Sequence, residues 1–186
     1  MRSTEHKLFT IIVLISMTFL SGCGYRFRAD GKPVGVEFDS LAIPLMKSTS
    51  SFIGFEADFT GIIREEFISH SAIPLVSEEE ASAVLTGRVY QIMTRPLTYN
   101  SISQTVEDRN ITYESTSSRR LTIRLDINLA DRMTGKQIWH ETDMEEEARF
   151  EVVADPLITR YNQQQALLKI ARLLAKRIYL KTVERF

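Results

Sequence analysis

The segment Leu121-Thr122-Ile123-Arg124-Leu125-Asp126-Ile127-Asn128-Leu129 alternates strictly between aliphatic and polar residues. Successive side chains of a β-strand point to opposite faces of a sheet. The pattern therefore predicts a strand with one face in a hydrophobic core and the other in water, which antiparallel sheets permit. This segment decides the fold class, because it requires a sheet that is covered on one side only.

A turn and a partner strand are expected directly after this segment. Residues 131–136 combine polar side chains with Gly135, which suits a turn position of positive φ. The chain then returns from Gln137 to about Phe150, so residues 119–150 are predicted to form a β-hairpin.

Helical spacing predicts two amphipathic helices, one at about residues 54–70 and one that begins near residue 156. In the second, Asp155 is a plausible N-cap and Pro156 suits the first helical position. The apolar face of the first helix holds Phe55, Phe59, Ile62, Ile63 and Phe67, and that of the second holds Leu167, Ile170, Leu174 and Ile178.

Two further strands complete the predicted order. One covers residues 38–45, where Pro44 indicates a strand end or a sheet edge, and the other covers residues 83–95. The order strand, helix, strand, strand, strand, helix favours an α+β fold. We expect a two-layer sandwich, in which an approximately four-stranded, mostly antiparallel sheet carries both helices on one face.

The segment Leu97–Ser118 is unusually long and polar for a connection within a compact domain. It either forms a flexible loop or continues the flanking strands as a polar hairpin tip that enters a partner. The recurring tyrosines and β-branched residues favour the hairpin.

The N-terminal residues have the layout of a bacterial lipoprotein signal. Arg2 and Lys7 precede an apolar run from Leu8 to Leu20, which is shorter than the roughly 20 residues of a spanning helix. The run ends at Leu20-Ser21-Gly22-Cys23, which resembles a lipobox and contains the only cysteine of the chain. We therefore expect cleavage before Cys23 and acylation of its thiol. Gly24, rather than aspartate, follows it, which favours the outer membrane facing the periplasm.

This reading divides the chain into a signal peptide (1–22), a lipidated cysteine with a tether (23–36) and one periplasmic domain (37–186). A tether of about twelve residues reaches at most about 40 Å, so the domain is expected close to the inner leaflet of the outer membrane. Removing residues 1–22 takes two of the 23 basic and one of the 24 acidic residues, which leaves a formal charge of −2. Such a balance does not favour nucleic acid as a partner.

No residue pattern indicates catalysis. His6 leaves with the signal peptide, and His70 and His140 are isolated, without the spacing of a metal site. The sequence has no nucleophile elbow and no phosphate-binding glycine loop. We therefore expect no enzyme activity, no metal and no cofactor.

Arginine side chains bind phosphate in a bidentate manner, so the basic residues in and beside the segment 97–118 are candidates for an anionic ligand. The alternative is ordinary solubilising charge. The candidates are Arg95, Arg109, Arg119 and Arg120, together with Arg132 and Lys136 in the turn.

Several fragments, in order, resemble the LPS-assembly lipoprotein family LptE. They are Cys23-Gly24-Tyr25-Arg26-Phe27, Leu41-Ala42-Ile43-Pro44, Phe55–Thr60 continuing to Ile63–Phe67, Ala83–Val89, and Asp131–Trp139. Together they cover most of the mature chain, although the Thr-Gly-Lys-x-x-Trp hairpin also occurs in other periplasmic lipoproteins.

The resemblance implies a non-enzymatic partner of the outer-membrane barrel LptD. Members of the family plug that barrel, assist its assembly and bind lipopolysaccharide during delivery to the cell surface. Their fold, a small sheet with two helices on one side, agrees with the sandwich predicted here. The family's lipopolysaccharide contacts do not transfer to residues 97–118, so the basic candidates rest on charge and position. An alternative function is a lipoprotein activator of a cell-wall synthase or a secretin pilotin.

Overall fold

The computed structural model describes residues 38–49, 54–106 and 109–183, which belong to one compact unit. The expected signal peptide, Cys23 and the tether lie outside the described residues. The elements are β1 (Leu41–Ala42), β2 (Lys47–Ser48), α2 (Phe55–His70), β3 (Ala83–Val106), β4 (Arg109–Asp131), β5 (Gln137–Glu151) and α3 (Pro156–Val183).

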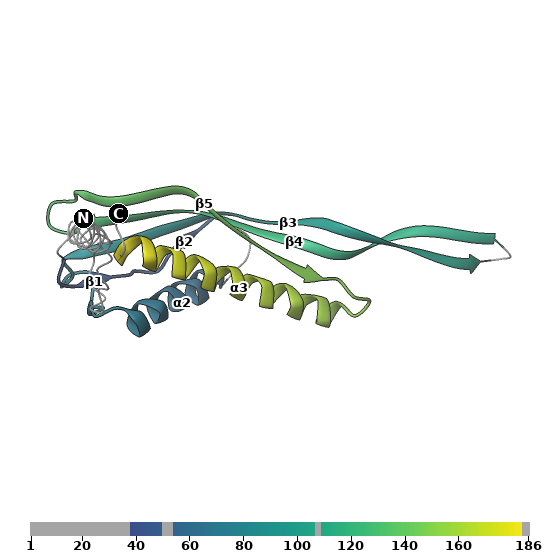
Figure 1. Ribbon diagram of the computed structural model, residues 1–186, viewed down its shortest axis with the longest axis horizontal. Helices are drawn as coiled ribbons and strands as arrows, with labels where there is room; N and C mark the ends of the chain where they lie inside the picture. The colour runs from purple at the N-terminus through teal and green to yellow at the C-terminus, as the bar shows by residue number, and fades with distance from the viewer. Residues whose placement is uncertain (1–37, 50–53, 107–108, 184–186) are drawn as a thin grey trace, which may run out of the picture. The chain divides into compact units, whose positions relative to one another are not determined.

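The fold is α+β, as predicted. The sheet has the order β1-β3-β4-β5, with β2 also paired to β3. The long strands β3, β4 and β5 are antiparallel to their neighbours, whereas β1 and β2 run parallel to β3. Figure 1 shows α2 and α3 on the same face of this sheet. The two-layer sandwich with a mostly antiparallel sheet is therefore confirmed.

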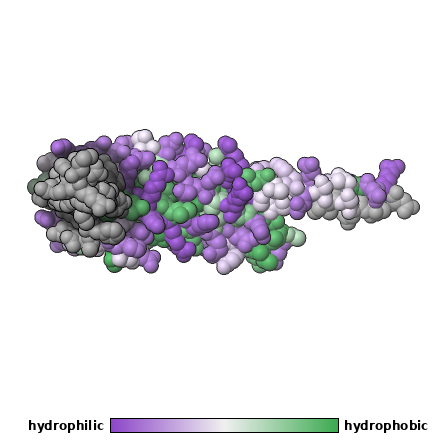
Figure 2. Space-filling view, viewed as in Figure 1, coloured by the Kyte–Doolittle hydropathy of each residue, from purple (hydrophilic) through white to green (hydrophobic). Residues whose placement is uncertain are grey.

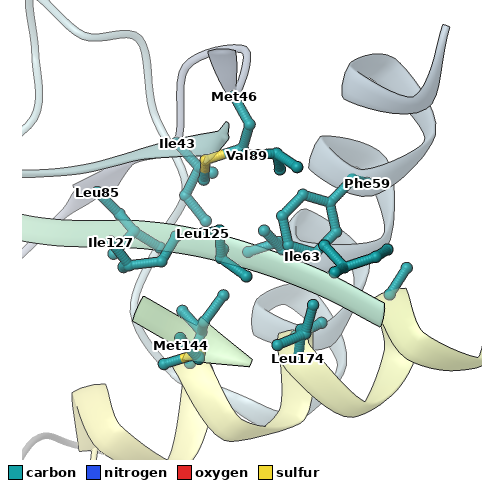
Figure 3. Close-up of a cluster of buried hydrophobic side chains, with 14 of the residues drawn as sticks. Ile43, Met46, Phe59, Ile63, Leu85, Val89, Leu125, Ile127, Met144 and Leu174 are labelled. Atoms are coloured by element: carbon teal, nitrogen blue, oxygen red, sulfur yellow. The ribbon is translucent and has the colours of Figure 1, made fainter. Parts of the chain in front are cut away.

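The core lies between the sheet and the two helices. The five aliphatic side chains of the alternating segment in β4, Leu121, Ile123, Leu125, Ile127 and Leu129, are fully buried. Figure 3 shows side chains of the sheet meeting Phe59 and Ile63 of α2 and Leu174 of α3. The opposite face of the sheet, which we call the open face, carries the polar residues of the same alternation, and neither α2 nor α3 covers it.

Both predicted helices are present with their predicted apolar faces. In α2, Phe55, Phe59, Ile63 and Phe67 are buried, and in α3 the buried side chains include Ile170, Leu174 and Ile178. Asp155 caps α3 as expected, because its Oδ1 accepts the backbone N–H of Leu157 at 2.8 Å. Among the described residues, no helix combines the length and the apolar composition that crossing a membrane requires.

The predicted strand 38–45 is wrong in extent, because the structure has only the short strands β1 and β2 there. The backbone between them is bonded to side chains of α2 instead of a neighbouring strand. Arg64 donates from Nε to the carbonyl oxygen of Ile43 at 2.9 Å, and the N–H of Met46 donates to Thr60 Oγ1 at 2.9 Å. Pro44, which has no N–H, ends the pairing as expected.

The strand predicted at 83–95 is longer than expected, because β3 continues to Val106 and pairs with β4 from Arg109. The segment 97–118 is thus a continuation of both strands, and the hairpin interpretation is confirmed over the loop. Figure 1 shows this part extending beyond the ends of both helices. We call the two-stranded part from Leu97 to Ser118 the ribbon.

Gly87 provides a test of the packing between β3 and the core. A Cβ atom at this position would lie 2.5 Å from Ile127 Cδ1 and 2.5 Å from Met46 Sδ. Both of those side chains are almost completely buried. We therefore expect Gly87→Ala to lower the free energy of unfolding by about 1–3 kcal/mol, the usual cost of overpacking, in urea denaturation.

Gly61→Ala is the matched control, because Gly61 lies in the interior of α2 and a Cβ there meets no atom within 4 Å. Alanine in a helix is more favourable than glycine by about 0.5–1 kcal/mol. The control should therefore stabilise the protein. Equal effects of the two substitutions would contradict the packing described for Gly87.

Candidate functional site

The open face of the sheet is the main polar surface of the fold, because alternate residues of its strands point away from the core. Its residues form cross-strand rows, because directly paired residues of antiparallel strands point to the same face. Within residues 38–49, 54–106 and 109–183, no three His, Cys, Asp or Glu side chains meet in an arrangement that would hold a metal ion. His140 is exposed in β5 opposite Asn128, and the carbonyl oxygen of His70 accepts a hydrogen bond from Tyr179.

One group of charges on the open face is internally compensated. In β4, Arg124 Nη2 lies 2.5 Å from Glu145 Oε2 and Arg124 Nε lies 3.6 Å from Asp143 Oδ1, both in β5. These carboxylates raise the pKa of Arg124 further. The hydroxyl of Tyr90 donates a hydrogen bond to Asp143. Two carboxylates thus offset the charge of Arg124, although its Nε has no hydrogen-bond partner among the described residues, and this makes it a poor candidate for binding an external anion.

The backbone at Asp143, the residue that contacts both Arg124 and Tyr90, is irregular. Its φ is 57°, and it is the only non-glycine residue with positive φ among the described residues. It lies in a β-bulge, because β5 has an extra residue between the pairs Ile127–Glu141 and Leu125–Met144. The N–H of Asp143 donates to Asp126 Oδ1 at 3.0 Å, so the bulge is stabilised from the neighbouring strand.

A second group of charges on the open face is compensated only in part. Arg95 of β3 pairs with Arg120 of β4, and Arg120 pairs with Arg149 of β5. We call these three residues the arginine row. Arg120 and Arg149 face away from the core, because their neighbours Leu121, Ala148 and Phe150 are buried, and Arg95 shares the face of Arg120 as its direct partner.

The arginine row concentrates positive charge in a short distance. Directly opposed residues have Cβ atoms about 4.5–5.5 Å apart, and like charges in such positions destabilise a sheet. Arg120 has one ion pair, at 3.4 Å from Glu147, and its Nε has no hydrogen-bond partner among the described residues. Arg95 and Arg149 are exposed and have no ion pair with any described residue. The row is therefore suited to an anion that bridges adjacent strands.

The structure places only two of the predicted basic residues, Arg95 and Arg120, in this row. Arg119 is paired with Pro96 on the other face, and Arg109 begins β4 at the far end of the ribbon. Eleven residues of strand separate Arg109 from Arg120, which is about 36 Å, so these two residues cannot bind one phosphate group.

Arg132 and Lys136 lie in the β4–β5 turn, away from the row. Arg132 Nε donates to the carbonyl oxygen of Ala81 at 2.7 Å, so its guanidinium has a structural contact. The turn itself forms as predicted, with Gly135 at φ 67°. Asp131 accepts the N–H and the hydroxyl of Thr134 at 2.7 Å each, and these bonds lower the pKa of the Asp131 carboxyl.

Arg149 is the residue that sequence reasoning missed. It stands between Ala148 and Phe150 in a strand whose alternation is obscured by Glu145, Glu146 and Glu147. The only available signal was strand alternation, which places the side chain of Arg149 on the opposite face of the strand from those of Ala148 and Phe150. The register that aligns it with Arg120 depends on the bulge at Asp143 and was not visible in the sequence.

The ribbon is the second feature that a partner could contact. Beyond its base, where Ser118 pairs with Glu151 of β5, no described strand or helix lies beside it in Figure 1. Its register shifts at Leu97 and at Ser117. Tyr99, Ile111 and Tyr113 are about half exposed on it. Hydroxyl groups link its strands, as in the contact of 3.1 Å between Ser103 Oγ and Thr112 Oγ1.

Comparisons with known proteins give a match to one family model and a similar fold in solved structures. A model of the family LptE, described as lipopolysaccharide-assembly, matches residues 38–182. No curated protein matches the sequence. The solution structure of lipoprotein B from Nitrosomonas europaea is similar, with 12% sequence identity and a TM-score of 0.53, over 86% of this chain and 90% of that chain. Rare lipoprotein B from Shewanella oneidensis has 12% identity and a TM-score of 0.46, over 77% and 94%. At these identities the likeness shows the fold alone.

Tyr90 gives a prediction for the compensated network. The hydrogen bond to Asp143, followed by burial and the nearby negative charges, raises the pKa of Tyr90 from 10.0 to about 12. The unfolded chain releases this proton near pH 10 while the folded protein keeps it. The stabilising contribution is therefore complete below pH 10 and is lost as the pH rises to about 12.

In an absorbance titration of tyrosinate, we expect one late phase near pH 12 that disappears in Tyr90→Phe. Tyr161→Phe removes an exposed tyrosine of α3 and should leave the late phase in place. A late phase that survives in Tyr90→Phe would show that Tyr90 is not held by Asp143.

Proposed function

The chain belongs to the LptE family of lipopolysaccharide-assembly proteins, and from this premise we propose its specific role. It is a non-enzymatic outer-membrane lipoprotein that plugs an LptD-type β-barrel, assists assembly of that barrel and binds lipopolysaccharide during transport to the cell surface. Cys23 carries the lipid anchor in the inner leaflet of the outer membrane, and the domain faces the periplasm.

The arginine row is the observation that carries lipopolysaccharide binding. Lipopolysaccharide presents phosphate groups on its headgroup, and arginine forks bind phosphate oxygens in pairs. Arg95 and Arg149 lie on both sides of Arg120 with no carboxylate partner of their own among the described residues. A bound phosphate would offset the repulsion within the row.

The ribbon supports docking into a barrel. From Thr98 to Val106 it has nine residues, or about 30 Å of strand, which is close to the thickness of the hydrocarbon core of a bilayer. A two-stranded hairpin alone is only marginally stable in water. Outer-membrane barrels have polar interiors, and a hydroxyl-rich ribbon can satisfy its hydrogen bonds there.

The size of the ribbon is also appropriate for a stable contact. Standard protein interfaces use about 20–30 residues on each side, and the range 97–118 supplies a comparable number. The open face adds polar area beside the base of the ribbon. Polar interfaces of this kind need satisfied hydrogen bonds on both sides.

Substitution of the two uncompensated arginines tests lipopolysaccharide binding. We expect Arg95→Gln with Arg149→Gln to weaken affinity for purified lipopolysaccharide about tenfold, which corresponds to about 1.4 kcal/mol. The dependence of binding on salt should also decrease, because fewer charges are exchanged on binding. Isothermal titration at several salt concentrations measures both effects.

The charge-matched control is Arg172→Gln with Lys176→Gln, two exposed residues of α3 outside the open face. It changes the net charge equally and should leave affinity close to that of the unmodified protein. Equal losses in both variants would mean that overall charge, and not the arginine row, attracts the ligand.

Shortening the ribbon tests the barrel partner. Replacing residues 99–117 by Asn-Gly joins the directly paired residues Thr98 and Ser118 by a two-residue turn and keeps every buried residue of β4. We expect the variant to remain folded, with cooperative urea unfolding, but to lose the large β-barrel that the unmodified protein brings down in equal amount during affinity purification from detergent extracts.

Two outcomes would contradict the proposal. Retention of the barrel by the shortened protein would exclude the ribbon as the docking element. Recovery of a cell-wall synthase or a secretin in place of an LptD-type barrel would replace the proposed partner.

A further inference from the structure

The corner between β5 and α3 exposes an unusual amount of apolar surface. Among the described residues, eleven large hydrophobic side chains are exposed, and four of them lie in residues 153–161. We call these four residues, Val153, Leu157, Ile158 and Tyr161, the apolar corner. Leu157 is 75% exposed and Tyr161 is 60% exposed. Figure 2 shows hydrophobic surface over the start of α3, near the base of the ribbon.

The backbone that displays the apolar corner is fixed from several sides. Thr159 Oγ1 accepts the N–H of Val153 at 3.0 Å and donates to the carbonyl oxygen of Val153 at 3.1 Å. Asn162 Nδ2 donates to the carbonyl oxygen of Glu151 at 3.1 Å. The N–H of Val152 donates to the carbonyl oxygen of Ser117 in β4 at 2.9 Å.

In the first turns of α3, apolar side chains are exposed to solvent while polar side chains bond to the backbone. Thr159 and Asn162 bond to the backbone of residues 151–153. Leu157, Ile158 and Tyr161 are exposed, and Tyr161 is a helical neighbour of both others, because it follows Leu157 by four residues and Ile158 by three. A rigid frame reduces the entropy lost when these side chains become covered. The arrangement is therefore organised in advance for contact with an apolar medium.

The charges around the apolar corner are mainly basic. Arg119 and Arg160 are exposed nearby, against Asp155, whereas Arg149 and Glu151 belong to the open face. Asp155 already accepts the N–H of Leu157 and lies at the positive end of the α3 dipole. Aliphatic tips with tyrosine and arginine beside them match the boundary between lipid headgroups and acyl chains.

We propose that the apolar corner inserts into the headgroup–acyl boundary of the membrane to which the protein is anchored, as a second point of membrane contact. The occupant is a phospholipid leaflet containing anionic lipid. This contact requires acylation of Cys23 only to keep the domain near the bilayer, and it does not depend on lipopolysaccharide or on a barrel.

The length of the tether permits this second contact. The apolar corner and β1 lie at opposite ends of the part of the sheet that the helices cover (Figure 1). The helix between those ends, α3, has 28 residues, or about 42 Å. The chain from Cys23 to Phe38 reaches about 50 Å when extended. The chain before Phe38 is therefore long enough for the lipid on Cys23 to reach the leaflet that the apolar corner contacts, even when β1 lies at the far end of the domain. In this orientation the ribbon can still point into a barrel.

Site-specific fluorescence tests the proposal on the mature, lipidated protein inserted into vesicles of phosphatidylethanolamine and phosphatidylglycerol. Leu157→Cys introduces a thiol for an environment-sensitive fluorophore, and acylated Cys23 does not react. Spin-labelled lipids in the vesicles should quench most of the emission at position 157. The variant should fold normally, because Leu157 is largely exposed.

Met133→Cys is the matched control, since Met133 in the β4–β5 turn is 76% exposed. Little quenching at 133 with strong quenching at 157 supports the proposal. Equal quenching at both positions, or none at 157, overturns it. An emission change at 157 that requires an added β-barrel also overturns it, and assigns the apolar corner to a protein interface instead.

Discussion

The burial of one face of β4 is the constraint on which the rest of the structure depends. Residues 121–129 lie in a strand that is paired on both sides, so their backbone groups are satisfied within the sheet and their aliphatic side chains must find cover elsewhere. Both helices supply that cover from the same side. Because the two faces of a strand alternate with every residue, the same arrangement leaves Arg124, Asp126 and Asn128 on the open face.

The strands are buried on one face only where the helices cover them. Beyond Leu121 toward the ribbon, β4 has no further fully buried aliphatic side chain, and β5 stops pairing at Ser118. The strands β3 and β4 continue nevertheless, held by their own ladder and by hydroxyl contacts. The molecule thus has a core that is stable by packing and a ribbon whose stability depends on what surrounds it. Such a division suits a protein that folds alone and completes its structure with a partner.

The sequence predicts the core well, because periodicity is a direct consequence of burial. The apolar stripes of α2 and α3, the cap at Asp155 and the Gly135 turn all follow local rules, and all are present. The predicted strand 38–45 is shortened to β1, and β2 was not predicted, because Arg64 and Thr60 compete for the backbone of residues 43–46. The arginine row could be predicted only in part. Arg95 and Arg120 were candidates from charge, but Arg149 joins them through a register that the bulge at Asp143 shifts, and bulges have no reliable sequence signal.

The distribution of charge on the open face explains why the arginine row, and not the arginine nearest the centre of the strand, is the candidate site. Each carboxylate near Arg124 reduces its attraction for an external anion, while Tyr90 and Asp126 fix those carboxylates in place. Toward the ribbon, Glu147 compensates only Arg120. Arg95 and Arg149, which have no ion pair with a described residue, therefore lie next to the base of the ribbon. A ligand with phosphate and acyl groups, or a membrane surface containing anionic lipid, encounters complementary chemistry at that end of the domain.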